Sequence, residues 1–164
     1  MQPIESTETI LIVDDNPHNL EVLSETLLDA GLDVAVATSG ESALRQMEYN
    51  VPSLILLDVM MAGMDGFEMC QRLKANPATQ DIPVLFMTAL TDSVDKVKGF
   101  NLGAVDYITK PFQQEEVLAR VRTHLKLRSL AKHLEDKVIE RTAELSKSLY
   151  ELQQTQLQLV QSEK

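Results

Sequence analysis

Short apolar runs separated by amphipathic stretches constrain the fold of this chain more than any other feature. Continuous apolar runs of this length are typical of buried parallel strands. Four of them lead into polar residues: Ile10–Val13 into Asp14-Asp15, Leu54–Leu57 into Asp58, Val84–Met87 into Thr88, and Val105–Ile108 into Thr109-Lys110. Sites in open α/β sheets lie outside the carboxyl ends of the strands. We therefore expect three carboxylates, a hydroxyl and an ammonium group to converge.

Helix signals alternate with these runs and with a fifth run, Val34–Ala37. Asn16 followed by Pro17 predicts a helix start, and Ser39 can cap the next helix. The last strand is expected near Ala104–Ile108. Five strands alternating with helices imply a parallel sheet with right-handed crossovers, whose strand order this pattern does not determine.

Composition and charge exclude several classes of function. The net charge is −10 and no segment is strongly basic, which disfavours nucleic-acid binding. The single cysteine, Cys70, excludes an internal disulfide and favours a reducing compartment. No apolar stretch approaches the ~20 residues that span a bilayer, so no membrane association is expected of this chain. A cytoplasmic, bacterial location is the expectation.

The chain from about Gln113 to Lys164 contains neither glycine nor proline, which predicts one long helix. Its apolar residues follow a heptad pattern with one stutter and two polar positions, forming a stripe made of Leu127, Ala131, Leu134, Val138, Thr142, Leu145, Leu149, Leu152, Gln156 and Leu159. A helix of ~50 residues is ~75 Å long and cannot bury this stripe on one small domain. A parallel dimeric coiled coil is predicted, and a solvated, partly frayed helix is the alternative.

The converging charges indicate which kind of reaction this site could support. Three carboxylates, Asp14, Asp15 and Asp58, repel one another unless a cation neutralises them, and Mg²⁺ prefers such oxygen ligands. A phosphoryl group on one aspartate would meet the metal ion, the Lys110 ammonium and the Thr88 hydroxyl. This arrangement meets the electrostatic needs of phosphoryl transfer.

Several motifs resemble the receiver domain of bacterial two-component response regulators over about residues 8–125. They are Ile-Val-Asp-Asp-Asn (12–16), Leu-Leu-Asp-Val-Met-Met (56–61), Met-Asp-Gly-Phe-Glu (64–68), Met-Thr-Ala (87–89) and Gly-Ala-Val-Asp-Tyr-Ile-Thr-Lys-Pro-Phe (103–112). The resemblance implies a flavodoxin-like (βα)5 doubly wound fold with strand order 2-1-3-4-5. The chain departs from the family at Ala62, where proline is common, so that loop is expected to be less restrained.

The resemblance also implies roles at the acidic site. Asp58 would accept a phosphoryl group from the phosphohistidine of a histidine kinase or phosphotransfer protein. Asp15 and Asp58 would bind Mg²⁺ together with the Met60 carbonyl, and Asp14 would act through water.

Further roles fall on the fourth and fifth strands. Lys110 would pair with a phosphoryl oxygen, and Thr88 would hydrogen-bond another. Tyr107 would be the aromatic residue whose rotamer follows Thr88, and the Lys110-Pro111 peptide is expected to be cis. Met60 lies two residues after Asp58, and Leu90 lies two residues after Thr88. Neither side chain can orient an attacking water, which suggests slow self-dephosphorylation. The alternative is that both residues serve only to pack their loops.

The tail resembles the signalling helix that precedes the core of many sensor histidine kinases, on residues 134–145 and 156–164. We therefore expect an N-terminal tail over residues 1–8, a receiver over 9–125 and a coiled-coil signalling helix over 126–164. No kinase catalytic motif is visible in the sequence. The resemblance of the tail suggests that the chain is a fragment of a longer protein in which a histidine kinase core would follow. A stand-alone regulator with a dimerising tail is the alternative.

Other functions fit less well. A docking module that works without phosphorylation would have no use for the intact acidic site. A flavin phosphate would be repelled by Asp14 and Asp15. A haloacid-dehalogenase-type phosphatase needs a second aspartate at position 60, which is methionine here.

Overall fold

The computed structural model describes residues 8–89 and 93–162, apart from the side chains of residues 93–95. The chain divides into two compact units, residues 1–125 and 126–164.

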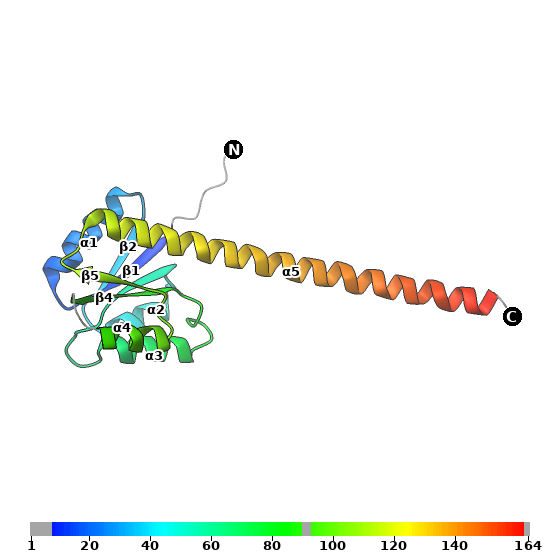
Figure 1. Cartoon of the computed structure of the whole chain (residues 1–164), viewed down its shortest axis with the longest axis horizontal. Helices are drawn as coiled ribbons and strands as arrows, with labels where there is room; N and C mark the ends of the chain where they lie inside the picture. The colour runs from blue at the N-terminus through cyan, green and yellow to red at the C-terminus, as the bar shows by residue number, and fades with distance from the viewer. Residues whose placement is uncertain (1–7, 90–92, 163–164) are drawn as a thin grey trace. The chain divides into compact units, whose positions relative to one another are not determined.

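Five parallel strands form the sheet of the first unit (Figure 1). They are β1 (Thr9–Val13), β2 (Asp33–Ala37), β3 (Leu54–Asp58), β4 (Val84–Ala89) and β5 (Asp106–Lys110). Their order is β2-β1-β3-β4-β5, which confirms the order and the flavodoxin-like fold implied by the family resemblance.

Strand β5 begins and ends two residues later than predicted. Its pairing with β4 continues to Thr88↔Thr109 and Ala89↔Lys110, so Lys110 is the last residue of the strand rather than part of a following loop. The Lys110-Pro111 peptide is cis, as expected. Proline has no backbone N–H, so the ladder stops there.

Helices alternate with the strands: α1 (Pro17–Asp29), α2 (Gly40–Met47), α3 (Gly66–Ala75), α4 (Ser93–Asn101) and α5 (Gln114–Ser162). The predicted caps are confirmed. The Asn16 side chain accepts from the backbone N–H groups of His18 and Asn19, and the Ser39 hydroxyl accepts from that of Ser42. These bonds satisfy backbone donors that the first turn of a helix leaves open.

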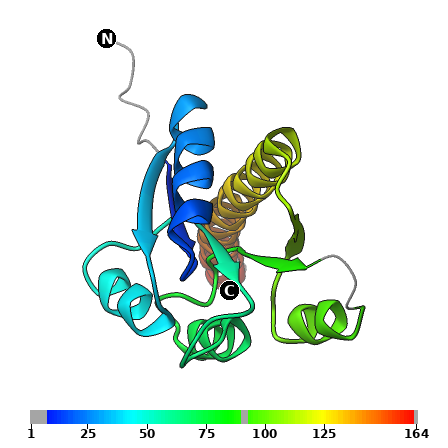
Figure 2. The same cartoon turned by 90° about the vertical axis from the view of Figure 1, so that its left-hand side faces the viewer.

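Alternate residues of the strands point to opposite faces of the sheet and contribute to two separate hydrophobic cores, one on each face. Helix α1 and the first turns of α5 pack on one face, where the core contains residues such as Ile12, Leu56 and Val121. Helices α2 and α3 pack on the other face, around residues such as Leu57 and Phe86. Figure 2 shows the helices on both sides of the sheet. The central strands are buried from both sides, which explains their unbroken apolar sequences.

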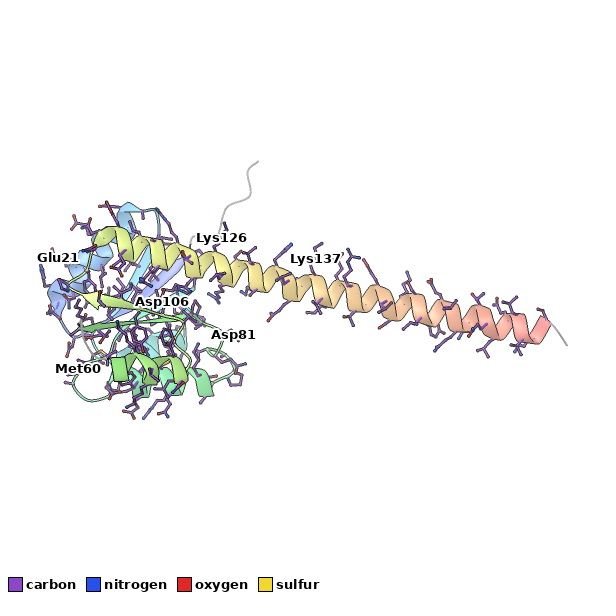
Figure 3. The ribbon with its side chains drawn as sticks, viewed as in Figure 1. Glu21, Met60, Asp81, Asp106, Lys126 and Lys137 are labelled. Carbon is purple, nitrogen blue, oxygen red and sulfur yellow. The ribbon has the colours of Figure 1, made fainter. Side chains whose placement is uncertain are left out.

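The second unit consists of α5 from Lys126 onward. The leucine and valine residues of the stripe, such as Leu134 and Leu145, are each more than half exposed. Lys126 and Lys137 mark this part of the helix in Figure 3. Among the helices of residues 8–89 and 93–162, none is both long enough and apolar enough to cross a membrane.

Asp106 at the start of β5 ties the first turns of α5 to the sheet. Its carboxylate accepts from Arg120 Nη1 at 2.6 Å and lies 2.9 Å from His124 Nε2. Burial acts to raise the pKa of the Asp106 carboxyl. Hydrogen bonds to His124, to the Tyr107 N–H and to Arg120 outweigh it, so the pKa lies below its usual value.

We expect Asp106→Asn to lower the free energy of unfolding by about 1 kcal/mol at pH 7, because a partly exposed charged pair is lost. A carboxyl with a lowered folded-state pKa stabilises above its unfolded pKa of about 3.9, and this contribution disappears as the pH falls through the folded-state value. Urea unfolding at pH 7 and at successively lower pH should show the gap to wild type closing. Glu21→Gln, on the exposed face of α1, is the control, and an equal loss in both variants would contradict the role of Asp106.

Candidate functional site

Three carboxylates lie together at the carboxyl ends of β1 and β3. Asp58 is the last residue of β3 and is 3% exposed; Asp14 directly follows β1 and is fully buried, whereas Asp15 is exposed. Oxygen atoms of the three groups lie within 4.8 Å of one another. The expected convergence of these carboxylates is therefore present in the folded chain.

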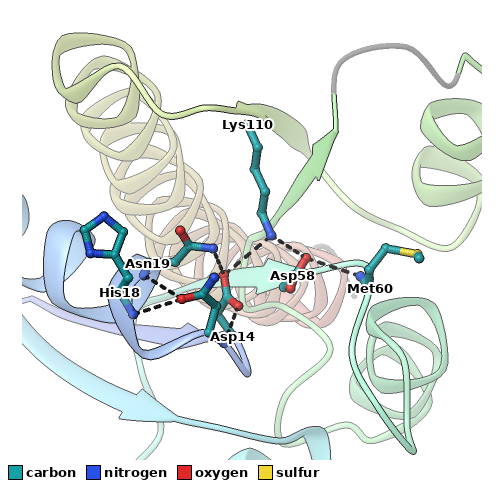
Figure 4. A network of polar contacts seen from close by, with 7 residues as sticks. Asp14, His18, Asn19, Asp58, Met60 and Lys110 are labelled. Carbon is teal, nitrogen blue, oxygen red and sulfur yellow. Dashed lines mark hydrogen bonds and ion pairs between the residues drawn. The ribbon is translucent and has the colours of Figure 1, made fainter.

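Lys110 reaches this group from the end of β5 (Figure 4). Its Nζ lies 2.9 Å from Asp58 Oδ1 and 3.6 Å from Asp14 Oδ2. The ammonium group thus bridges the two buried carboxylates and compensates part of their charge. Nearly buried charges are tolerated when they are paired in this way.

Two asparagines orient Asp14. Its Oδ1 accepts from the Asn16 N–H at 2.9 Å, and its Oδ2 accepts from Asn19 Nδ2 at 3.1 Å. Sequence reasoning identified Asn16 as a helix cap but missed Asn19. The signal was present, because Asn19 lies one turn after the cap and so faces the same end of the sheet.

Burial raises the pKa of the Asp58 carboxyl above its usual value. The hydrogen bond from Lys110 opposes this effect, and the negative charge of Asp14 adds to it. One ammonium group beside three carboxylates leaves unbalanced negative charge at this site. A hard divalent cation held by carboxylate oxygens would balance it, so the donor set fits Mg²⁺.

Met60 contributes to this site through its backbone. Its N–H donates to Asp58 Oδ1 at 3.2 Å, while its side chain is 77% exposed (Figure 3). Leu90, the other residue expected not to orient an attacking water, lies outside the described residues. An open hollow of about 540 Å³ adjoins the acidic group, lined by Asp15, Val59, Met60, Met61, Ala62, Gly63, Asp65, Phe67 and Lys98.

The loop after β3 has tertiary anchors although Ala62 replaces the common proline. Met64 is 5% exposed, and its sulfur approaches the position where a Cβ of Gly40 would lie. The Met64 N–H donates to Glu41 Oε1 at 3.4 Å. Contacts with α2 thus restrain this loop in place of a fixed proline φ.

Thr88 and Tyr107 lie on β4 and β5, and both are 6% exposed. The Thr88 hydroxyl donates to the carbonyl of Ala89 at 3.3 Å. The Tyr107 hydroxyl donates to the carbonyl of Lys96 on α4. In this arrangement the threonine hydroxyl is bonded to a carbonyl of its own strand, and the tyrosine side chain is buried.

Gly66 also belongs to this site, although the sequence did not identify it as a site residue. Its N–H donates to the Val59 carbonyl at 3.0 Å, and a Cβ at this position would lie 2.9 Å from Val59 Cα. Only glycine lets the first turn of α3 approach the backbone of Asp58 and Val59 so closely. Nothing in the local sequence specifies that approach, because it depends on the packing of α3 against β3.

Sequence comparisons agree with this geometry. The family described as "Response regulator receiver domain" matches residues 10–122. The DNA-binding dual master transcriptional regulator RpaA of Synechocystis is 46% identical over 130 residues, which are 77% of this chain and 54% of RpaA. The response regulator PleD of Caulobacter vibrioides is 43% identical over 114 residues, which are 70% of this chain and 25% of PleD. The chain thus spans about half of one relative and a quarter of the other.

Solved structures give the same result. The chemotaxis protein CheY4 of Vibrio cholerae superposes with a TM-score of 0.69 at 30% identity, over 72% of this chain and 98% of CheY4. The receiver domain of a signal transduction histidine kinase from Syntrophus aciditrophicus gives 0.69 at 36% identity, over 73% of this chain and 91% of that one. With the paired aspartates, the lysine and the strand order in place, the chain belongs to the response regulator receiver domain family of two-component systems.

Proposed function

We propose that Asp58 accepts a phosphoryl group from the phosphohistidine of a histidine kinase or phosphotransfer protein. The observation that supports this most directly is the buried Asp58 carboxylate, held at 2.9 Å by Lys110 beside Asp14. Lys110 and the Met60 N–H both donate to Oδ1 of Asp58, so we assign Oδ2 as the nucleophile. The Oδ2–phosphorus bond forms as the bond between phosphorus and the donor's imidazole nitrogen breaks, and the imidazole leaves with the electron pair.

The neighbouring groups have separate roles in this proposal. Asp15, Asp58 and the Met60 carbonyl would hold Mg²⁺, with Asp14 acting through water. The bound ion supplies positive charge to the phosphoryl oxygens. Lys110 pairs with one of these oxygens once the phosphoryl group displaces its contact with Asp58. Such preorganised charges stabilise a transferring phosphoryl group without reorganisation.

Thr88 and Tyr107 form the proposed switch. The Thr88 hydroxyl would turn from the Ala89 carbonyl to a phosphoryl oxygen, because the charged acceptor makes the stronger hydrogen bond. Movement of the β4 end then changes the surroundings of Tyr107 on the adjacent strand. These two residues link the acidic site to α4.

We assign residues 1–8 to an N-terminal tail, 9–125 to the receiver and 126–164 to a dimeric coiled coil that passes the switch to a downstream output such as a histidine kinase core. Helix α5 is unbroken from Gln114 to Ser162, which supports transmission as a rotation or register change. The proposed setting is the bacterial cytoplasm, where these donors act.

A second copy of this chain is the proposed occupant of the exposed stripe. Thr142 and Gln156 share one heptad position, a, in the part of the stripe that follows the stutter. In a parallel, in-register pair each would face its own counterpart, whereas an antiparallel pair would place it against a leucine. Polar residues at a therefore favour the parallel arrangement.

Incubation with acetyl phosphate and Mg²⁺ should add the mass of one phosphoryl group to wild type and none to Asp58→Ala, as measured by intact mass spectrometry. Removal of Mg²⁺ with EDTA should abolish the adduct. An unmodified wild type would instead support the alternative, a docking module that works without phosphorylation.

Asp58→Asn should stabilise the metal-free protein at pH 7. A carboxyl with a raised folded-state pKa costs stability as the pH rises from its unfolded value through the folded one, so a neutral amide removes this cost. We expect a melting temperature higher by roughly 3–6 °C, the shift for about 1 kcal/mol in a domain of this size, and a smaller gain near pH 4.

Mg²⁺ should stabilise wild type more than Asp58→Asn. At ten times its Kd it should stabilise wild type by about 1.4 kcal/mol and Asp58→Asn much less. Thermal unfolding in EDTA and in Mg²⁺ measures both effects. A wild-type melting temperature that ignores Mg²⁺ would count against the metal site.

Leu145→Asn combined with Leu149→Asn should convert a dimer into a monomer in sedimentation experiments, because two layers of the stripe are lost. Ile139→Asn, at a position that is 68% exposed and outside the stripe, is the matched control and should remain dimeric. A single Leu149→Cys should form an interchain disulfide on oxidation, since parallel, in-register helices bring the two copies of this residue together; Cys70 is buried and should not compete. Monomeric wild type would refute the coiled coil.

A further inference from the structure

Gly99 lies in α4 where no side chain fits. A Cβ built on it would lie 2.8 Å from each of two ring carbons of Phe86 and would overlap the hydroxyl of Tyr107. Phe86 is fully buried at the centre of its core, so its ring has little room to move away. The two rings thus occupy the space that a side chain at position 99 would need.

The backbone of Gly99 does not itself require glycine. The glycines with positive φ among the described residues are Gly31, Gly63 and Gly103, and Gly99 is not one of them. A helical glycine without such a requirement is unfavourable relative to alanine, which has the higher helix propensity. The glycine is therefore explained by what packs against it.

Tyr107 is the residue that uses this space. Its ring lies edge-on to Phe100, with centroids 4.9 Å apart, and 5.9 Å from the ring of Phe86. Its hydroxyl donates to the Lys96 carbonyl, which belongs to the same helix as Gly99. Tyr107 of β5 is thus fastened to the backbone of α4 across a surface that Gly99 keeps free of side-chain atoms.

We infer that Gly99 is a positioning residue that allows Tyr107 to lie buried against α4, and so determines whether the β5 strand and the α4 helix act as one unit. The inference rests on the proposed role of Tyr107 in the switch, because only then does its position affect signalling. A methyl group at position 99 would force the tyrosine ring outward and break its bond to Lys96. The phosphoacceptor itself would be untouched, since the atoms nearest to a methyl group at position 99 belong to Tyr107 and Phe86 and not to the acidic site.

A double-mutant cycle on thermal stability tests the steric part of this inference. Gly99→Ala should lower the melting temperature of wild type by at least about 4 °C through overpacking. In a Tyr107→Ala background the same change should cost much less or raise the melting temperature, because the ring is gone and alanine favours the helix. An equal rise in both backgrounds would overturn the inference, because Gly99 would then be an ordinary helix position.

The ring position can be read directly with 3-fluorotyrosine and fluorine NMR. The chain has three tyrosines, and Tyr49 and Tyr150 are 85% and 63% exposed, so the buried Tyr107 should give a distinct resonance that Tyr107→Phe removes. In Gly99→Ala this resonance should move toward those of the exposed tyrosines, with and without beryllofluoride. If the Tyr107 resonance did not move in Gly99→Ala, the proposed role of Gly99 in positioning Tyr107 would be refuted, even if the variant were less stable.

Phosphorylation separates this inference from the function on which it rests. Gly99→Ala should still gain one phosphoryl group from acetyl phosphate, while its Tyr107 resonance shows the outward position. If wild type gained none, the proposed function would fail, but the stability cycle and the resonance would still decide the role of Gly99. Loss of phosphorylation in Gly99→Ala alone, with Tyr107 still buried, would overturn the inference.

Discussion

The structure depends on keeping like charges buried at one edge of a sheet. Asp14 and Asp58 stand at the ends of adjacent strands, and Lys110 at the end of β5 supplies the compensating charge at 2.9 and 3.6 Å. Asp14 and Asp58 are both buried, so each of these charges interacts more strongly than it would on the surface. The chain maintains this arrangement because apolar cores on both faces fix the strands, and the strands fix the three side chains.

The negative charge at this site is only partly compensated in the free protein. One ammonium group cannot neutralise three carboxylates, and the negative charge of Asp14 adds to the effect of burial in raising the pKa of Asp58. An added cation and a phosphoryl group change that sum in opposite directions. The same electrostatic imbalance that costs stability in the free protein therefore makes the site responsive to both.

Much of this could be predicted from the sequence, for local reasons. The apolar runs located the five strands to within two residues at their ends, and Asn16 and Ser39 predicted the starts of the helices that follow β1 and β2. The strand order came from family resemblance, because alternation of strands and helices is compatible with several orders. Lys110 was expected after β5 and is part of it, since pairing with β4 decides where that strand ends. Gly66 and Gly99 were missed because their importance arises from the packing of separate elements, whereas Asn19 was missed although its partner Asp14 is only five residues away.

The shortness of strand β5 affects how this protein tolerates amino-acid substitutions. Tyr107 and Lys110 are three residues apart on one short strand, so their side chains leave it on opposite faces, one toward α4 and one toward the aspartates. Both depend on the same few backbone bonds to β4. Substitutions at the two positions should therefore not be independent of each other, and neither should substitutions in the groups that each contacts. Changes on the α4 side and on the acidic side are therefore expected to influence each other through the five residues of this strand.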